Sequence, residues 1–237
     1  MILILNCMKD DNLAVSFDRA IMRPLEAKGE KADFLRVPKA TQLPDFSPYS
    51  HIIISGSESS AVEDNPWDGL LLESVHTIMR LRKPLLGICY GHQFIARAIG
   101  GKQCVRKSGS PEFGWAEIQI TGNSLFTGIS TQTITSMVSH YDEVYNLPGG
   151  FKILASNACC AVHAFQFKDL PVWGIQFHPE YNIDEANEIF QLVSLSDPSF
   201  CRHSIRVTTP TAAQLQDNQR ILLNFLETGD SAPVKQP

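Results

Sequence analysis

The sequence has no run of basic residues, and no apolar stretch in it approaches the length of a membrane span. Its formal net charge is −5 at pH 7, which argues against a surface that binds nucleic acid. The opening Met1–Leu5 is apolar, but it is too short for a signal peptide and has no basic start. We therefore expect neither nucleic-acid nor membrane partners, and we expect Ile2–Leu5 to be a buried strand.

Disulfide and metal-binding patterns of cysteine are also missing. The six cysteines have no C-x-x-C spacing, and without a secretion signal the expected location is the reducing cytoplasm. The segment Cys159–His163 contains two cysteines and a histidine, but no second pair of ligands follows at a usable spacing, so no metal site is predicted. Gly100-Gly101-Lys102 lacks the rest of a phosphate-binding loop, and no cofactor is predicted.

Apolar strands and amphipathic helices alternate through the N-terminal part of the chain, a pattern typical of a parallel sheet covered on both faces. The predicted strands are Ile2–Leu5, Asp33–Val37, His51–Ile54 and Pro84–Ile88. The predicted helices are Leu13–Lys28, Leu70–Leu81 and one that starts after Cys89 and stops at Gly100-Gly101.

From Trp115 onward, short strand-like runs follow one another without long helices between them, which indicates a mixed or antiparallel extension of the same sheet. These runs are Ala116–Ile120, Thr133–Val138, Phe151–Ala155, Ala161–Phe167 and Val172–Phe177. Two helices, Asp184–Val193 and Ala212–Glu227, close the chain, the second capped by Thr209 or Thr211.

The predicted fold is α/β: a flavodoxin-like, mostly parallel sheet with helices on both faces and a small antiparallel extension, in one domain over 1–229. Residues 230–237 are predicted to be a disordered tail.

The segment Gly87-Ile88-Cys89-Tyr90-Gly91-His92-Gln93 reads as a nucleophile elbow that carries cysteine. A buried strand runs into Cys89, a helical pattern leaves it, and Gly87 and Gly91 supply the small residues that such a turn needs. The turn places the thiol at a helix N-terminus, where free N–H groups favour the thiolate. The alternative is a structural cysteine at an ordinary junction, but the paired glycines favour the elbow.

A cysteine nucleophile needs a base, a group that orients the base, and donors for an oxyanion. His178 follows the strand-like run Val172–Phe177 and so lies at the carboxyl end of a strand, and Glu180 comes two residues later. The oxyanion donors are predicted to be backbone amides, one from Tyr90 and one from the small-residue turn Ser55-Gly56-Ser57.

Taken together, Gly87–Gln93 and Gln176-Phe177-His178-Pro179-Glu180 resemble the motifs of the class I (triad-type) glutamine amidotransferases, above all the amidotransferase domain of GMP synthase and its stand-alone homologues. The resemblance spans about residues 45–182 and includes Ser139–Val144. It implies that Cys89 is the nucleophile, His178 the base and acid, and Glu180 the residue that orients it.

The same resemblance assigns further roles. It implies oxyanion-hole amides at Tyr90 and Ser57, and contacts to the substrate from Gln93, Ser139 and Tyr141. Domains of GMP synthase usually carry glycine where Ser57 stands, so this chain departs from them there. After Val193 only about forty residues remain, too few for an ATP-pyrophosphatase module, so we expect the chain not to be a complete GMP synthase.

The sequence leaves three functions open. A glutaminase would release ammonia from glutamine through a glutamyl thioester, either for a separate synthetase subunit or on its own. A γ-glutamyl peptidase would use the same triad on γ-glutamyl peptides or glutathione conjugates, with an amino acid or a peptide as the leaving group. A non-catalytic module that senses glutamine or regulates a synthetase is disfavoured, because all three triad positions are occupied.

Overall fold

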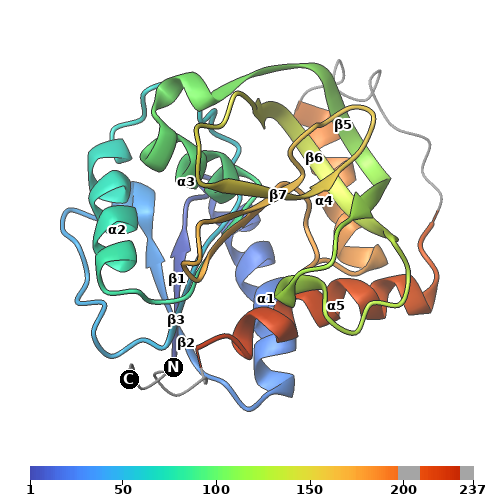
Figure 1. Ribbon diagram of the computed structural model, residues 1–237, viewed down its shortest axis with the longest axis horizontal. Coiled ribbons are helices and arrows are strands. Elements are labelled where there is room, and N and C mark those ends of the chain that lie inside the picture. The colour runs from blue at the N-terminus through green and yellow to red at the C-terminus, as the bar shows by residue number, and fades with distance from the viewer. Residues whose placement is uncertain (197–208, 230–237) are drawn as a thin grey trace.

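The computed structural model describes residues 1–196 and 209–229, and Figure 1 shows how their helices and strands are arranged. The strands are β1 (Ile2–Asn6), β2 (Ala32–Arg36), β3 (His51–Ile54), β4 (Leu85–Ile88), β5 (Val105–Ile120), β6 (Thr133–Val144), β7 (Phe151–Ser156), β8 (Ala164–Phe167) and β9 (Val172–Ile175). The α-helices are α1 (Asp11–Ala27), α2 (Asp68–Arg80), α3 (Tyr90–Gly100), α4 (Ile183–Ser196) and α5 (Ala212–Leu226). Short 3-10 turns cover Val37–Lys39, Lys102–Cys104 and Ser124–Phe126.

All the described strands join one sheet in the order β2-β1-β3-β4-β9-β8-β7-β5-β6. The first five in this order are parallel, and the remaining four pair antiparallel. The parallel part has the 2-1-3-4-5 order of flavodoxin-like folds, with β9 in the fifth place. The predicted fold class, with its antiparallel extension, is therefore confirmed.

Helices cover both faces of the sheet, and each layer of helices has its own apolar core. On one face α1, α4 and α5 contribute Phe17, Ile189 and Phe225, while on the other α2 and α3 contribute Leu71 and Phe94. Figure 1 shows these two layers on either side of the strands. Strands β1, β3, β4 and β9 are buried along their whole length, which is why they read as continuous apolar runs in the sequence.

The antiparallel extension differs from the prediction in the length of its strands. The predicted run Ala116–Ile120 is the end of the 16-residue β5, and Thr133–Val138 is the first half of the 12-residue β6. The early part of β5 contains Gly109 and Pro111, which do not favour a strand. Pairing with β6 overrides this local preference, and a shift of register between Lys107 and Glu112 accommodates the irregular residues.

The last helix begins as predicted, with Thr211 as its N-cap. The Thr211 hydroxyl accepts a hydrogen bond from the Gln214 amide, and the Gln214 side chain accepts one from the Thr211 amide, which together form a capping box. The predicted tail, 230–237, lies outside the described residues. Across 1–196 and 209–229, every helix is too short or too polar to cross a membrane.

Candidate active site

Cys89 lies where β4 ends and α3 begins, with a backbone φ of 51° and ψ of −101°. A residue other than glycine rarely adopts a positive φ, and such strain is found mostly at functional sites. Hydrogen bonds hold the turn: the Cys89 amide donates to the Ile175 carbonyl over 2.8 Å, and the Gly91 amide donates to the Ser55 carbonyl over 3.1 Å. A Cβ on Gly87 would overlap the Gly91 carbonyl group, so only glycine fits there. The chain therefore forms the predicted strand–turn–helix geometry around Cys89.

His178 and Glu180 lie beside Cys89, at the carboxyl end of β9. The His178 amide donates to the Met137 carbonyl over 2.8 Å, which ties this turn to β6. The His178 Nδ1 atom is 2.6 Å from Glu180 Oε1, and the other side of the ring faces the Cys89 sulfur with which it hydrogen-bonds. Gly56 packs against both, since a Cβ there would be 3.1 Å from His178 Cε1 and 3.6 Å from Cys89 Cβ. The three predicted triad residues therefore lie together in the order cysteine, histidine and glutamate, while their catalytic roles stay a prediction.

The electrostatics of this group favour a protonated His178. Burial opposes a charge on the ring, but the Glu180 carboxylate and the hydrogen bond to Cys89 outweigh it and raise the pKa of His178 from 6.5 to about 10. Glu180 is almost fully buried, so its charge acts on the ring with little screening by water. The raised pKa of His178 thus favours the imidazolium form of the ring at neutral pH.

The two predicted oxyanion donors flank Cys89. Tyr90 is the first residue of α3, so the geometry of the helix leaves its amide without an intrahelical acceptor. The Ser57 hydroxyl donates to the Cys7 carbonyl over 2.8 Å and accepts from the Ser59 amide over 3.0 Å. Because these two bonds occupy the hydroxyl, the backbone amide of Ser57 is the group left to face an oxyanion. The role of both amides stays a prediction.

Substitution of Ser57 separates its amide from its hydroxyl. Ser57→Ala keeps the amide and should stay within about tenfold of the native kcat, whereas Ser57→Pro removes the amide and should cost about 10²–10³-fold. Steady-state kinetics measures both, and the melting temperature of each variant checks that the loop has not unfolded. Equal losses in the two variants, with melting temperatures unchanged, would show that the amide has no special role.

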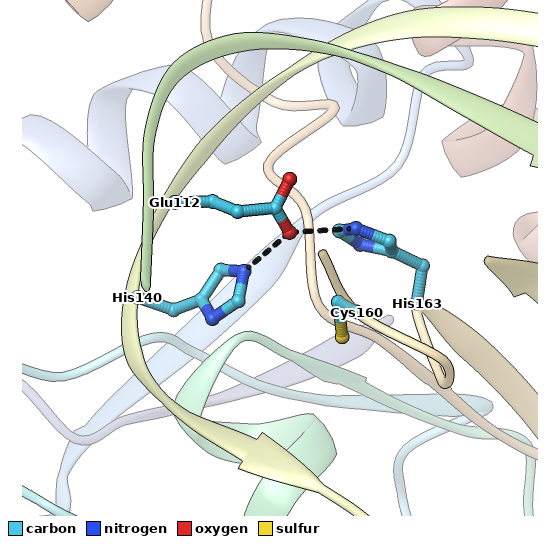
Figure 2. A group of neighbouring side chains, drawn as sticks. All are labelled: Glu112, His140, Cys160 and His163. Carbon is cyan, nitrogen blue, oxygen red and sulfur yellow. Dashed lines mark hydrogen bonds and ion pairs between the residues drawn. The ribbon is translucent and has the colours of Figure 1, made fainter. Parts of the chain in front are cut away.

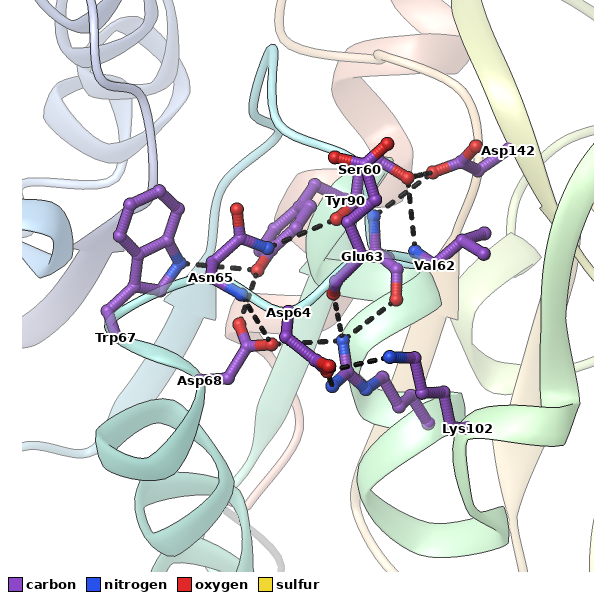
Figure 3. A network of polar contacts seen from close by, with 12 residues as sticks. Ser60, Val62, Glu63, Asp64, Asn65, Trp67, Asp68, Tyr90, Lys102 and Asp142 are labelled. Atoms are coloured by element: carbon purple, nitrogen blue, oxygen red, sulfur yellow. Dashed lines mark hydrogen bonds and ion pairs between the residues drawn. The ribbon is translucent and has the colours of Figure 1, made fainter.

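A network of polar contacts holds the loop that follows β3 and carries Ser57 (Figure 3). The Asp142 carboxylate accepts from the Ser60 hydroxyl over 2.6 Å and from the Ala61 amide over 3.0 Å. At the far end of the loop, the Trp67 indole N–H donates to the Tyr90 hydroxyl over 3.2 Å. The loop is thus bonded both to β6 and to the first residue of α3, and these contacts fix the two oxyanion candidates relative to each other.

A cleft of about 290 Å³ opens at Cys89. It is lined by residues from four parts of the chain: Ser57–Ser60, Cys89 and Gln93, Lys107, and Ser139–Asp142 with Val193. All three predicted substrate contacts, Gln93, Ser139 and Tyr141, are therefore on its walls.

Two of these residues are held in place by contacts within the protein. The amide nitrogen of Gln93 donates to the Asp142 carbonyl over 2.9 Å and to Gln176 Oε1 over 3.0 Å. Both of its hydrogens are used, which leaves the amide oxygen as the atom of Gln93 that can accept from a ligand. The Cys89 thiol lies 3.6 Å from the Ser139 carbonyl, so β6 forms one wall of the cleft beside Cys89.

Asp142 and Lys107 are site residues that the sequence analysis did not single out. Besides holding the loop at Ser60, the Asp142 carboxylate is 3.0 Å from Lys107 Nζ, and both side chains line the cleft. Asp142 lies in the run that carries the family resemblance, but nothing in its spacing indicates which side chain it contacts. Its partners come from segments 35 and 82 residues away, and only the folded sheet brings them together.

Comparison with known proteins places this chain in a family. The model of the family "Glutamine amidotransferase class-I" matches residues 11–193. The chain is 34% identical over 160 residues to a subunit of the glutamine-hydrolyzing GMP synthase of Methanothermobacter thermautotrophicus, covering 67% of this chain and 84% of that protein. The chain belongs to the class I glutamine amidotransferase family.

Two further relatives show the extent of the likeness. The chain is 40% identical over 144 residues to the glutamine-hydrolyzing GMP synthase of an Azoarcus species, covering 57% of this chain but only 26% of that protein. The match thus spans about a quarter of that longer relative. A crystal structure of a glutamine amidotransferase from Thermotoga maritima superposes with a TM-score of 0.74, covering 95% of this chain and 96% of that one. At 18% identity, this last likeness supports the fold alone.

Proposed function

We propose that this class I amidotransferase hydrolyses the side-chain amide of glutamine to glutamate and ammonia. The observation that carries the proposal is the placement of Cys89 at a strained turn, hydrogen-bonded to a His178 that Glu180 orients, at the mouth of the cleft. A thiolate beside an imidazolium can attack an amide carbon and then protonate the departing nitrogen.

The proposed reaction has two halves. In the first, the Cys89 sulfur attacks the amide carbon, the C–N bond breaks, and the imidazolium of His178 donates its proton so that ammonia leaves from a glutamyl thioester. In the second, neutral His178 takes a proton from water, whose oxygen attacks the thioester, and the C–S bond breaks to give glutamate and the free thiolate. In both halves, the amides of Tyr90 and Ser57 would stabilise the oxyanion.

The walls of the cleft suit the polar end of glutamine. Gln93 offers an amide oxygen, which can accept from an ammonium group, and Ser139 and Tyr141 present the edge of β6 beside it. Asp142 and Glu58 add negative charge at the cleft, and Lys107 adds a positive charge near Asp142. An α-amino acid, with one ammonium and one carboxylate, has the charges that such a surface can pair.

We also propose that the ammonia serves a separate synthetase subunit. The archaeal relative is named as one subunit of a glutamine-hydrolyzing GMP synthase, and the chain covers 84% of that relative, which supports this arrangement. A cytoplasmic location would follow from it and remains part of the proposal.

Parallel assays of product release test the substrate. The enzyme is incubated with L-glutamine and, separately, with γ-glutamyl dipeptides, and ammonia and free amino acids are both quantified. We expect ammonia from glutamine with a higher kcat/KM than any release of an amino acid from the dipeptides. The Cys89→Ser variant, purified in the same way, is run in both assays and measures how much of each turnover depends on the Cys89 thiol.

Two results would overturn the proposal in different ways. A higher kcat/KM for γ-glutamyl dipeptides would make the chain a γ-glutamyl peptidase. No turnover of either substrate, together with no covalent labelling of Cys89 by a glutamine-like diazo-ketone, would make it a binding module. The labelling is read by mass spectrometry of the Cys89 peptide, with and without the candidate synthetase.

A further inference from the structure

Four buried side chains with metal-binding atoms, none of them a member of the triad, meet in one group: Glu112, His140, Cys160 and His163 (Figure 2). Their potential ligand atoms all lie within 4.8 Å of one another, and no side chain in the group is more than slightly exposed. The set offers two imidazole nitrogens, one sulfur and one carboxylate oxygen. Such a mixed set of nitrogen, sulfur and oxygen donors suits zinc, and the nitrogen and sulfur donors do not suit magnesium or calcium.

Two neighbouring strands and one loop build this group. Glu112 on β5 is directly opposite His140 on β6 in the sheet, so the register of this pair brings their side chains together. The other two come from the loop between β7 and β8, which is closed by a hydrogen bond from the Asn157 amide to the Cys160 carbonyl. The His163 amide donates to the Ala155 carbonyl over 2.8 Å and fixes the end of the loop.

In a neutral His140 ring only one of the two nitrogens carries a hydrogen. The contacts of the ring place that hydrogen on Nδ1, away from Glu112. Its Nδ1 atom is 3.0 Å from the Asp142 carbonyl, which can only accept, so Nδ1 carries the hydrogen. The other ring nitrogen, Nε2, then presents a lone pair, and it lies 3.1 Å from Glu112 Oε2, which is also an acceptor. Two lone pairs facing each other in a dry interior require a shared cation or an additional proton.

His163 presents a second imidazole to the same carboxylate oxygen. Its Nε2 atom is 2.9 Å from Glu112 Oε2, the oxygen that also faces His140. Within residues 1–196 and 209–229, Nδ1 of this fully buried ring has no hydrogen-bond partner, and Nε2 has only the Glu112 carboxylate within reach. A ring in this state is poorly accounted for by packing alone, because a buried polar group without a partner costs about 1–3 kcal/mol. A metal ion at the centre of the group would satisfy its Nε2 atom.

Two of the spacings in the group, and its charge, fit a tetrahedral zinc ion. Bonds of about 2.0–2.3 Å to Zn²⁺ place neighbouring ligand atoms about 3.4 Å apart, close to the 3.1 and 2.9 Å from Glu112 Oε2 to the two histidines. A thiolate and a carboxylate neutralise the two charges of the ion, so the loaded site would carry no net charge. The second oxygen of Glu112 accepts from the Asn157 side chain over 2.7 Å, an outer contact typical of metal ligands.

We propose that Glu112, His140, Cys160 and His163 form a structural zinc site. The sequence analysis predicted no metal, because it found no second pair of ligands near Cys160 and His163; that pair comes from β5 and β6. The site would lock the part of β6 that lines the cleft, since His140 stands between Ser139 and Tyr141. It would thus join the β7–β8 loop to the wall of the active site, and it does not depend on which amide the enzyme hydrolyses.

The metal content of the purified full chain tests this proposal. The protein is prepared with zinc, dialysed free of loose metal, and analysed for zinc per chain in four forms: native, Cys160→Ala, Glu112→Gln and Cys159→Ala. Cys159 is exposed and adjacent to Cys160, so its variant is the matched control. All four forms are made in a Cys89→Ala background, so that the Cys89 thiol cannot bind metal, and "native" here means this background without a further substitution.

We expect one zinc per chain in the native and Cys159→Ala forms. Loss of an outer contact of a metal site lowers metal affinity by roughly 10–100-fold. Cys160→Ala and Glu112→Gln each change a direct ligand, so their affinity for zinc should fall by more than that. Cobalt substitution adds a direct readout, because a thiolate–cobalt absorption band should appear in the native and Cys159→Ala forms and be absent from Cys160→Ala. Zinc should also raise the melting temperature of the native and Cys159→Ala forms alone.

Three results would overturn the proposal. The first is a native form that binds no zinc under these conditions. The second is a Cys160→Ala form that binds zinc as tightly as the native form. The third is a cobalt band that survives in Cys160→Ala. Glu112→Gln keeps the shape of the side chain. If Cys160→Ala does not fold, the zinc content of Glu112→Gln therefore decides whether the proposal stands.

Discussion

Replacement of Cys89 by serine is expected to abolish turnover and leave the fold and substrate binding nearly intact. Serine keeps the shape of the side chain at the elbow, but its hydroxyl is far less acidic than a thiol and supplies almost no anion for the attack. The expected loss in kcat is about 10⁴-fold or more, the scale on which removing a nucleophile disables a catalytic triad. Ammonia release from glutamine measures it, and isothermal titration with glutamine checks binding.

The chain offers a control for this substitution. Cys159 is also a cysteine, but it is exposed and belongs neither to the cleft nor to the triad. Cys159→Ser should retain the activity of the native protein, which shows that the loss in Cys89→Ser is not a general effect of removing a thiol. Residual activity of Cys89→Ser above about a tenth of the native kcat would place the nucleophile elsewhere, since a true nucleophile accounts for far more than tenfold.

The strained turn that carries Cys89 could be predicted because its causes are local. An apolar strand, a cysteine flanked by glycines and a helical pattern are all contained in Gly87–Gln93, and the backbone around Cys89 follows from them. His178 and Glu180 were predictable for a similar reason, because they follow a strand directly and the carboxyl ends of parallel strands share one edge of the sheet.

The remaining parts of the site depend on contacts between distant segments. Nothing near Glu112 or Pro111 indicates a strand as long as β5, and its length comes from pairing with β6 through a shift of register. That same register brings Glu112 opposite His140, so the group around Cys160 cannot be foreseen from ligand spacing along the sequence. The contact of Asp142 with Ser60 and Lys107 is likewise a product of tertiary structure.

Replacement of His178 by alanine should lower kcat for glutamine by about 10²–10⁴-fold, the usual contribution of a proton-transferring side chain. Glu180→Gln should lower it less, because glutamine can still accept from the ring and orient it, while only the negative charge is lost. Steady-state ammonia release measures both variants, and their melting temperatures show whether either loss comes from unfolding. Full activity in His178→Ala would exclude the proposed mechanism.

The pH dependence separates the charge of Glu180 from a merely structural role. In the native protein, burial opposes the imidazolium, but Glu180 and Cys89 raise the pKa of His178 from 6.5 to about 10. The stabilisation of the fold that comes with this raised pKa is fully present below pH 6.5 and is lost as the pH rises to about 10. Glu180→Gln removes the neighbouring charge, so the ring should lose its proton at a lower pH.

NMR of the histidine rings and the pH profile of kcat/KM should report the same shift in Glu180→Gln. The imidazolium donates the proton to the leaving ammonia, so the alkaline limb of the profile should move to lower pH together with the titration of His178. A carboxylate that served only to pack the turn would lower activity without moving that limb. If neither the alkaline limb of the kcat/KM profile nor the titration of His178 shifts in Glu180→Gln, Glu180 is not the residue that orients His178 and stabilises its imidazolium.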